Sequence, residues 1–217
     1  MNFLQLVNEL RRECSVAGNG LTTVVAQTGE SQRLVQWIKQ ANDEIQGKYF
    51  DWLFLRVADT FDTLAGNDTV SKPDDLNIWD VQRFYIGTQK LEVMDYADYE
   101  PMDADSGQPH TVIVMPDNSL LLYPNPDAAY TVSYDYYRTP NVLSIDTDEP
   151  LIPSQFHRVI VYRAMAMYAN YESAQELSKQ ALEVYAEAMR QLQNHQLPEK
   201  SQYYGRSNPL DIQVVAQ

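Results

Sequence analysis

The stretch from Leu151 to His195 constrains the fold most, because it carries two amphipathic patterns in succession. Pro153 precedes the first pattern and suits a first helical turn. Apolar and aromatic residues then recur at the spacing of one buried helical face, at Phe156, Val159, Ile160, Ala164, Met167, Tyr168 and Tyr171. A second stripe follows at Leu177, Ala181, Val184, Tyr185, Ala188 and Leu192. The stretch predicts a helical pair over residues 151–196, restarted by a capping box at Ser173-Ala174-Gln175-Glu176.

Two more helices are predicted near the start of the chain. Asn2 can cap the first, and Gln5 three positions later completes a capping box. Gly18-Asn19-Gly20 ends that helix, and Thr28 to Ser31 carries the start signals of the next. Residues 1–50 and 151–196 are therefore expected to form two halves of one four-helix scaffold.

The segment 51–150 between these halves has the texture of β structure. Glycines and prolines punctuate short runs of β-branched and aromatic residues, and helical periodicity disappears. The expected fold class is α+β, with an antiparallel β meander inserted into the helical scaffold. The expected strands are Ile78 to Ile86 with a hairpin partner at Lys90 to Met94, and then Thr111 to Met115, Leu120 to Tyr123 and Tyr130 to Tyr136.

Tyrosine is the compositional oddity, with 15 residues. Tyr130, Val132, Tyr134 and Tyr136 alternate with polar residues, which places them on one face of a strand. With Tyr137, these rings suit a sugar-stacking strip, but also a β core face or a subunit interface. The alternation favours the core or the interface.

Charge and cysteine content exclude several classes of protein. The 217 residues carry a net charge of −14, which disfavours binding nucleic acid by neutralising phosphates but would suit a passage through which DNA slides. Cys14 is the only cysteine, so neither an internal disulfide nor a cysteine-based zinc site is expected. Without a leader or an apolar run of transmembrane length, we expect a protein kept in the cytoplasm or built into a particle assembled there.

A search for catalytic motifs finds no phosphate-binding, dinucleotide-binding, zinc-protease or nucleophile-elbow pattern. The three histidines lie far apart; His157 is expected to be partly exposed, and His195 to complement a helix C-terminus. The run from Asp103 to Gly107 fails as a calcium loop, which leaves only a weak acidic site with Asp146 and Asp148. We therefore expect no enzyme, no metal and no cofactor.

Residues 197–217 are predicted to form an extended C-terminal arm. The segment carries apolar and aromatic residues but is too short for a core of its own, which is typical of tails that dock on a partner and equally of frayed chain ends.

Four segments together resemble the head–tail adaptor (head-completion or connector) proteins of tailed bacteriophages. The resemblance extends to about Pro198, and its segments are Gly18–Ile38, Pro73–Leu76 leading into Trp79–Ile86, Leu122–Val132, and Ile152–Arg158 continuing to Ala169. It implies a structural virion protein of the neck between capsid and tail, forming a ring of about twelve copies beneath the portal. Such a ring would extend the DNA channel without binding DNA specifically, provide a docking platform for the tail or a neck-completion protein, and need no membrane.

The arm would then carry the portal-binding residues, which are Tyr203, Tyr204, Arg206, Leu210, Ile212, Val214 and Val215. The outer faces of the second helical pair supply candidates for neighbour or channel contacts, which are Arg158, Arg163, Lys179, Glu183, Glu187 and Arg190.

Two alternatives rank below the adaptor hypothesis. A glycan hydrolase would need two carboxylates that converge in a cleft. A carbohydrate- or protein-binding module would need Tyr134, Tyr136 and Tyr137 to face outward.

Overall fold

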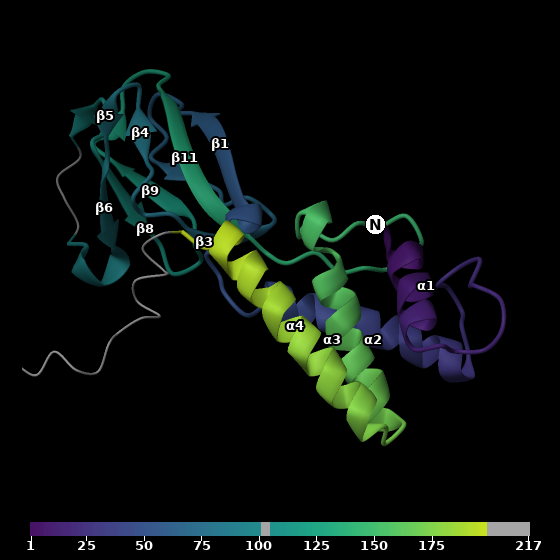
Figure 1. Ribbon diagram of the computed structural model, residues 1–217. Coiled ribbons are helices and arrows are strands. Elements are labelled where there is room, and N and C mark those ends of the chain that lie inside the picture. Colours follow the sequence, from purple (N-terminus) through teal and green to yellow (C-terminus); the bar gives the residue numbers. More distant parts are fainter. Residues whose placement is uncertain (101–104, 199–217) are drawn as a thin grey trace, which may run out of the picture. The chain divides into compact units, whose positions relative to one another are not determined.

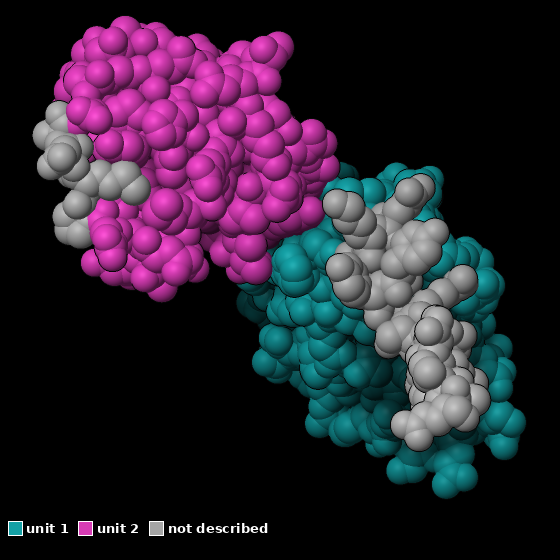
Figure 2. All heavy atoms as spheres, turned by 90° about the vertical axis from the view of Figure 1, so that its left-hand side faces the viewer, with its two compact units in different colours: residues 1–54, 140–217 teal, residues 55–139 magenta. Residues whose placement is uncertain are grey.

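The computed structural model describes residues 1–100 and 105–198, and the chain divides into two compact units. The first unit comprises residues 1–54 together with 140–217, and the second comprises residues 55–139 (Figure 2). The predicted portal-binding residues from Tyr203 to Val215 lie outside the described residues.

The first unit is helical, and its central element is α3 (Figure 1). α3 packs against each of the other three helices of the unit. The helices are α1 (Phe3–Glu13), α2 (Gly29–Gln46), α3 (Arg158–Tyr171) and α4 (Gln175–Gln196), with short 3-10 turns η1 (Leu53–Leu55) and η3 (Ser154–Phe156). Many side chains of the predicted apolar faces are buried, including Leu6, Leu10, Leu34, Ile38, Val159 and Ile160. Two residues of the predicted stripes, Tyr171 and Val184, are exposed instead.

The capping prediction is confirmed at α1 and wrong at α4. The side chain of Asn2 accepts from the backbone N–H of Gln5, and the Gln5 side chain accepts from the N–H of Asn2, at 2.9 Å each. At α4 the N-cap is Ala174, without a side-chain cap. Ser173 instead adopts a left-handed conformation (φ 56°) that ends α3, and the N–H of Ala174 donates back to the Ala169 carbonyl at 2.9 Å.

The second unit is built from two main sheets that share a core (Figure 1). One has the order β1-β11-β4-β5, with β3 also paired to β11; the other has the order β2-β9-β8-β6, and β10 pairs with β7. The elements are β1 (Arg56–Asp62), β2 (Thr69–Val70), β3 (Leu76–Trp79), β4 (Tyr85–Ile86), β5 (Gln89–Lys90), β6 (Glu92–Asp95), η2 (Tyr96–Asp98), β7 (Ser106–Gly107), β8 (Thr111–Val114), β9 (Leu120–Tyr123), β10 (Asn125–Pro126) and β11 (Thr131–Arg138).

The fold class is α+β with antiparallel sheets, as predicted, but the connectivity departs from a simple meander. The β8–β9 hairpin is confirmed, whereas β11 pairs with β1, β3 and β4 instead of following β9 in its sheet. The expected strand Ile78 to Ile86 is interrupted by a turn between β3 and β4, and the expected return strand Lys90 to Met94 is also divided. Gln89–Lys90 pairs with β4, and Glu92–Asp95 leaves the hairpin to pair with β8 in parallel.

The aromatic face of β11 forms the centre of the shared core. Val132, Tyr134 and Tyr136 are buried against Trp79 and Phe84, and the Phe84 and Tyr134 rings stack at 6.1 Å between centroids. The alternation in the sequence therefore identified the buried face correctly. Burial of Tyr134, Tyr136 and Tyr137 also contradicts the binding-module alternative, which required these rings to face outward.

Candidate interaction surfaces

The loop before η3 is hydrogen-bonded to the first turn of α1 and to the segment that connects α1 with α2. The Asp146 carboxylate accepts hydrogen bonds from the Val24 N–H at 2.6 Å and the Thr23 hydroxyl at 3.1 Å. The carbonyl of Asp148 accepts from the Phe3 N–H at 2.7 Å, which satisfies a donor in the first turn of α1. These bonds make the loop part of the helical framework.

Hydrogen bonds from backbone N–H groups also occupy the two carboxylates of the predicted acidic site. The Asp148 carboxylate accepts from the N–H groups of Ser144 and Ile145 at 2.6 and 2.8 Å, and these hydrogen bonds lower its pKa. Asp146 and Asp148 are thus occupied as backbone acceptors. Among the described residues, no group of three or more histidine, cysteine, aspartate or glutamate side chains is placed to hold a metal ion.

Of the predicted neighbour-contact residues, Arg158 and Arg163 connect helices within the chain. Arg158 donates to the buried Glu9 carboxylate of α1 at 3.0 Å, and Arg163 donates to Glu44 of α2 at 2.7 Å. Arg190 pairs with Glu187 on the surface of α4 at 2.9 Å. Lys179 and Glu183 are exposed on α4. The α4 surface therefore remains the candidate for contacts with a neighbour.

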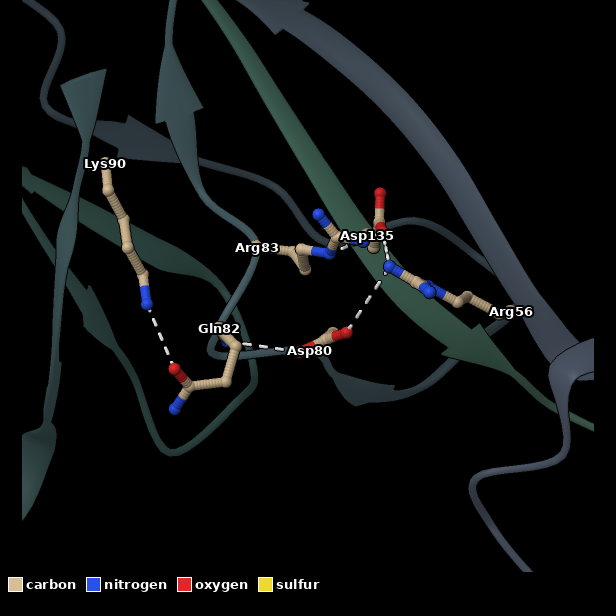
Figure 3. Close-up of polar contacts among 6 residues, drawn as sticks. All are labelled: Arg56, Asp80, Gln82, Arg83, Lys90 and Asp135. Carbon is tan, nitrogen blue, oxygen red and sulfur yellow. Dashed lines mark hydrogen bonds and ion pairs between the residues drawn. The ribbon is translucent and has the colours of Figure 1, made fainter. Parts of the chain in front are cut away.

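A charged cluster lies on the face of β11 opposite the aromatic core (Figure 3). Asp135 pairs with Arg56 of β1 and lies 3.6 Å from Arg83. Arg56 also lies 3.8 Å from Asp80, and Lys90 donates to Gln82 at 3.0 Å. The opposite charges within the cluster compensate one another, and the arrangement connects β1, β11 and the turn before β4.

The acidity of the chain is concentrated in the second unit. Residues 55–139 contain 15 acidic and five basic side chains, a net charge of −10 out of −14 for the chain. Such a unit repels polyanions.

His157 lies in a different environment from the one predicted, and the sequence did not indicate its contacts. His157 is buried, whereas partial exposure was expected. Its Nε2–H donates to the Ile152 carbonyl at 2.7 Å, and its Nδ1 lies 2.7 Å from the backbone nitrogen of Met1. Burial lowers the pKa of His157. His195 lies in the last turn of α4, as predicted; it is exposed, and its ring contacts Phe156.

The glycan-hydrolase alternative requires a cleft lined by two carboxylates. Four cavities formed by described residues each have at most one carboxylate in their lining, with Asp95 in one and Glu92 in another. The paired, converging carboxylates of that mechanism are not found in any of the four.

Ion pairs that join α3 to α1 and α2, a strongly acidic β unit and an exposed α4 surface are typical of a protein that acts as a structural scaffold. The chain matches the model of the SU10 adaptor protein family over residues 1–211, and it belongs to that family. This agrees with the resemblance to phage head–tail adaptors and makes the chain a phage structural adaptor. A search of curated proteins returns no match. None of the helices in the described residues is long and apolar enough to cross a membrane.

Proposed function

We propose that the chain is a head–tail adaptor that forms a ring beneath the portal, of about twelve copies, in the neck of the virion. The observation that carries this proposal is membership of the SU10 adaptor family over residues 1–211. In this role the ring extends the DNA channel and offers a platform on which the tail or a neck-completion protein docks. Assembly takes place in the host cytoplasm.

Charge supports a conduit that DNA passes without being held. The second unit carries 15 acidic and five basic side chains, so a ring that turns this unit toward its lumen would repel phosphates along the channel. In this proposal the role needs neither a cofactor nor catalysis.

The helices supply the means of closing a ring. A heterologous ring interface needs two different surfaces on each copy. In the proposed four-helix scaffold, α1 and α4 both pack on α3 and offer two distinct surfaces to neighbours.

Electron microscopy of the purified chain mixed with portal rings tests this function. We expect one added layer with the rotational symmetry of a closed ring. Portal rings that stay bare at saturating concentrations of the chain would contradict the proposal.

We further propose that the arm binds the portal through Tyr203, Tyr204, Arg206, Leu210, Ile212, Val214 and Val215. A chain that ends at Gln202 should retain the helical circular dichroism of the full chain but leave portal rings bare. The matched control carries the full arm with Asn208→Ser, a polar exchange outside the proposed contact residues. A truncated chain that still decorates the portal would contradict this role of the arm.

A further inference from the structure

Arg11 of α1 is a buried cation without a carboxylate partner. The residue is only 8% exposed, and its Nη2 donates to the Ala17 carbonyl at 2.8 Å. No carboxylate oxygen of residues 1–100 or 105–198 lies within 4.0 Å of its guanidinium nitrogens, whereas Arg12 pairs with Glu9 and Arg158 with Glu9 and Glu13. Burying a guanidinium is costly unless an anion compensates it.

The Arg11 side chain borders a cavity that has room for such an anion. The cavity measures about 560 Å³ and is lined by α1 residues together with the loop that follows the helix. Its lining consists of Gln5, Asn8, Arg11, Arg12, Ser15, Val16, Gly18 and Gly20, so both charged residues are cations.

The cavity wall is held in place by the chain itself. The Asn8 side chain donates to the Leu21 carbonyl at 3.0 Å and accepts from the Leu21 N–H at 2.7 Å. Gly18 adopts a φ of +95°, and a side chain there would meet Arg11 Nη2 at 3.5 Å. The loop therefore closes over the guanidinium without covering it with a side chain at this position.

We propose that this cavity receives a carboxylate side chain from a second copy of the chain, which pairs with Arg11. Arginine binds carboxylates through paired charge-assisted hydrogen bonds, and a chain with 30 acidic residues can supply them. The exposed α4 residues Glu176 and Glu183 are candidate donors, with no ion partner among the described residues. The inference rests on the proposed ring and gives one of its interfaces a chemical basis.

Two substitutions test the pairing from opposite sides. Arg11→Gln removes the cation. Gln5→Glu keeps the capping box with Asn2, since glutamate serves equally at that position, but adds a carboxylate to the cavity wall that competes with the incoming one. Each variant should weaken self-association by about tenfold or more, the scale of a lost charge-assisted hydrogen bond.

Sedimentation velocity over a concentration series, with and without portal rings, measures the association. Lys48→Gln and Gln36→Glu are matched controls, because they make the same charge changes at exposed positions of the first unit and should leave association unchanged. Thermal unfolding of Gln5→Glu should match the wild type, which separates the interface from the fold.

The outcomes separate this inference from the proposed function. Wild-type association that both cavity variants retain would overturn the inference and leave the adaptor role standing. A wild-type chain that stays monomeric, alone and with portal rings, would overturn both. Binding of a duplex oligonucleotide that Arg11→Gln abolishes would assign the cavity to phosphate and overturn the pairing with a second copy.

Discussion

The Asp146 carboxylate lies 2.6 Å from the backbone nitrogen of Val24, which joins two loops separated by 122 residues in the chain. The bond is charge-assisted, and the same oxygen accepts from the Thr23 hydroxyl. One side chain thus connects the segment that enters α2 with the segment that leads into η3 and α3.

Replacing Asp146 with alanine should lower the free energy of unfolding by about 2–3 kcal/mol. The substitution leaves the Val24 N–H, on a buried residue, without its acceptor, and hydrogen bonds to charged groups are worth about 1.5–3 kcal/mol. Urea unfolding followed by circular dichroism measures the change. Thr147→Ala removes an exposed neighbouring side chain and should stay within about 0.5 kcal/mol of the wild type. Equal effects of the two substitutions would show that the contact contributes nothing specific.

The ion pairs between helices should differ in strength according to burial. Glu9 is 7% exposed and receives Arg158 at 3.0 Å, so Glu9→Ala removes the shorter charged contact between α1 and α3 and leaves only that of Arg158 with Glu13 at 4.0 Å. We expect a loss of about 2–3 kcal/mol for Glu9→Ala. Glu187→Ala removes the exposed pair with Arg190 and should cost much less, because solvent screens surface ion pairs. Chemical denaturation of both variants checks this order, and a larger effect of the surface pair would refute it.

Much of the fold could be predicted because its signals are local. The helices follow from apolar periodicity, and Asn2 with Gln5 marks the start of α1 within four residues of sequence. The spacing of Tyr134 and Tyr136 predicts a buried strand face, because alternation along one strand is also a local signal. The sequence of Arg56 to Asp62 lacks a regular alternation of apolar and polar residues and does not predict a strand, although the segment forms β1. β1 forms because β11, more than seventy residues later, pairs with it.

The candidate surfaces were harder to predict, because they depend on contacts across the chain. His157 looks like a polar residue at a helix start, and its burial becomes visible only when Ile152 and Met1 close around it. Arg158 and Arg163 looked like outer-face residues, and their partners Glu9 and Glu44 lie on helices more than one hundred residues away. Arg11 gave no signal in the sequence, since the absence of a counter-charge is a property of the folded chain.

The buried tyrosines Tyr134 and Tyr136 of β11 should ionise only at high pH. The ring and the hydroxyl of Tyr134 should each contribute to stability, and separate substitutions can distinguish them. Burial raises the pKa of Tyr134 to about 12, assisted by the nearby Asp59 carboxylate, and burial with Asp75 raises that of Tyr136 to about 12. Tyr134→Ala should destabilise the fold by about 3–5 kcal/mol, as for large aromatic truncations, whereas Tyr134→Phe should cost about 1 kcal/mol.

Two measurements check the tyrosine prediction. Ultraviolet titration should show a fraction of tyrosines that ionises only near pH 12, reduced in Tyr134→Phe. Thermal unfolding should place Tyr134→Phe close to the wild type and Tyr134→Ala far below it. Exposed Tyr96 offers a control for stability, since Tyr96→Phe should leave thermal unfolding unchanged.

His157 should make the stability of the first unit depend on pH below neutrality. Burial lowers its pKa from the ordinary value of 6.5, so the folded state binds the proton less readily than the unfolded state. Well above pH 6.5 both states hold a neutral imidazole and the residue adds no pH dependence. As the pH falls below 6.5 the unfolded state takes up the proton first, so stability falls, with a slope of at most about 1.4 kcal/mol per pH unit.

Urea unfolding at pH 7.5, 6.5 and 5.5 measures this dependence, with His157→Gln as the comparison. The variant loses the buried imidazole contacts and should be less stable at pH 7.5, but its stability should change less between pH 6.5 and 5.5. Glu149, the carboxylate whose charge favours the protonated ring, remains in both chains, so the difference between them isolates His157. Parallel pH profiles would mean that the imidazole titrates alike in the folded and unfolded states, contrary to its burial between Ile152 and Met1.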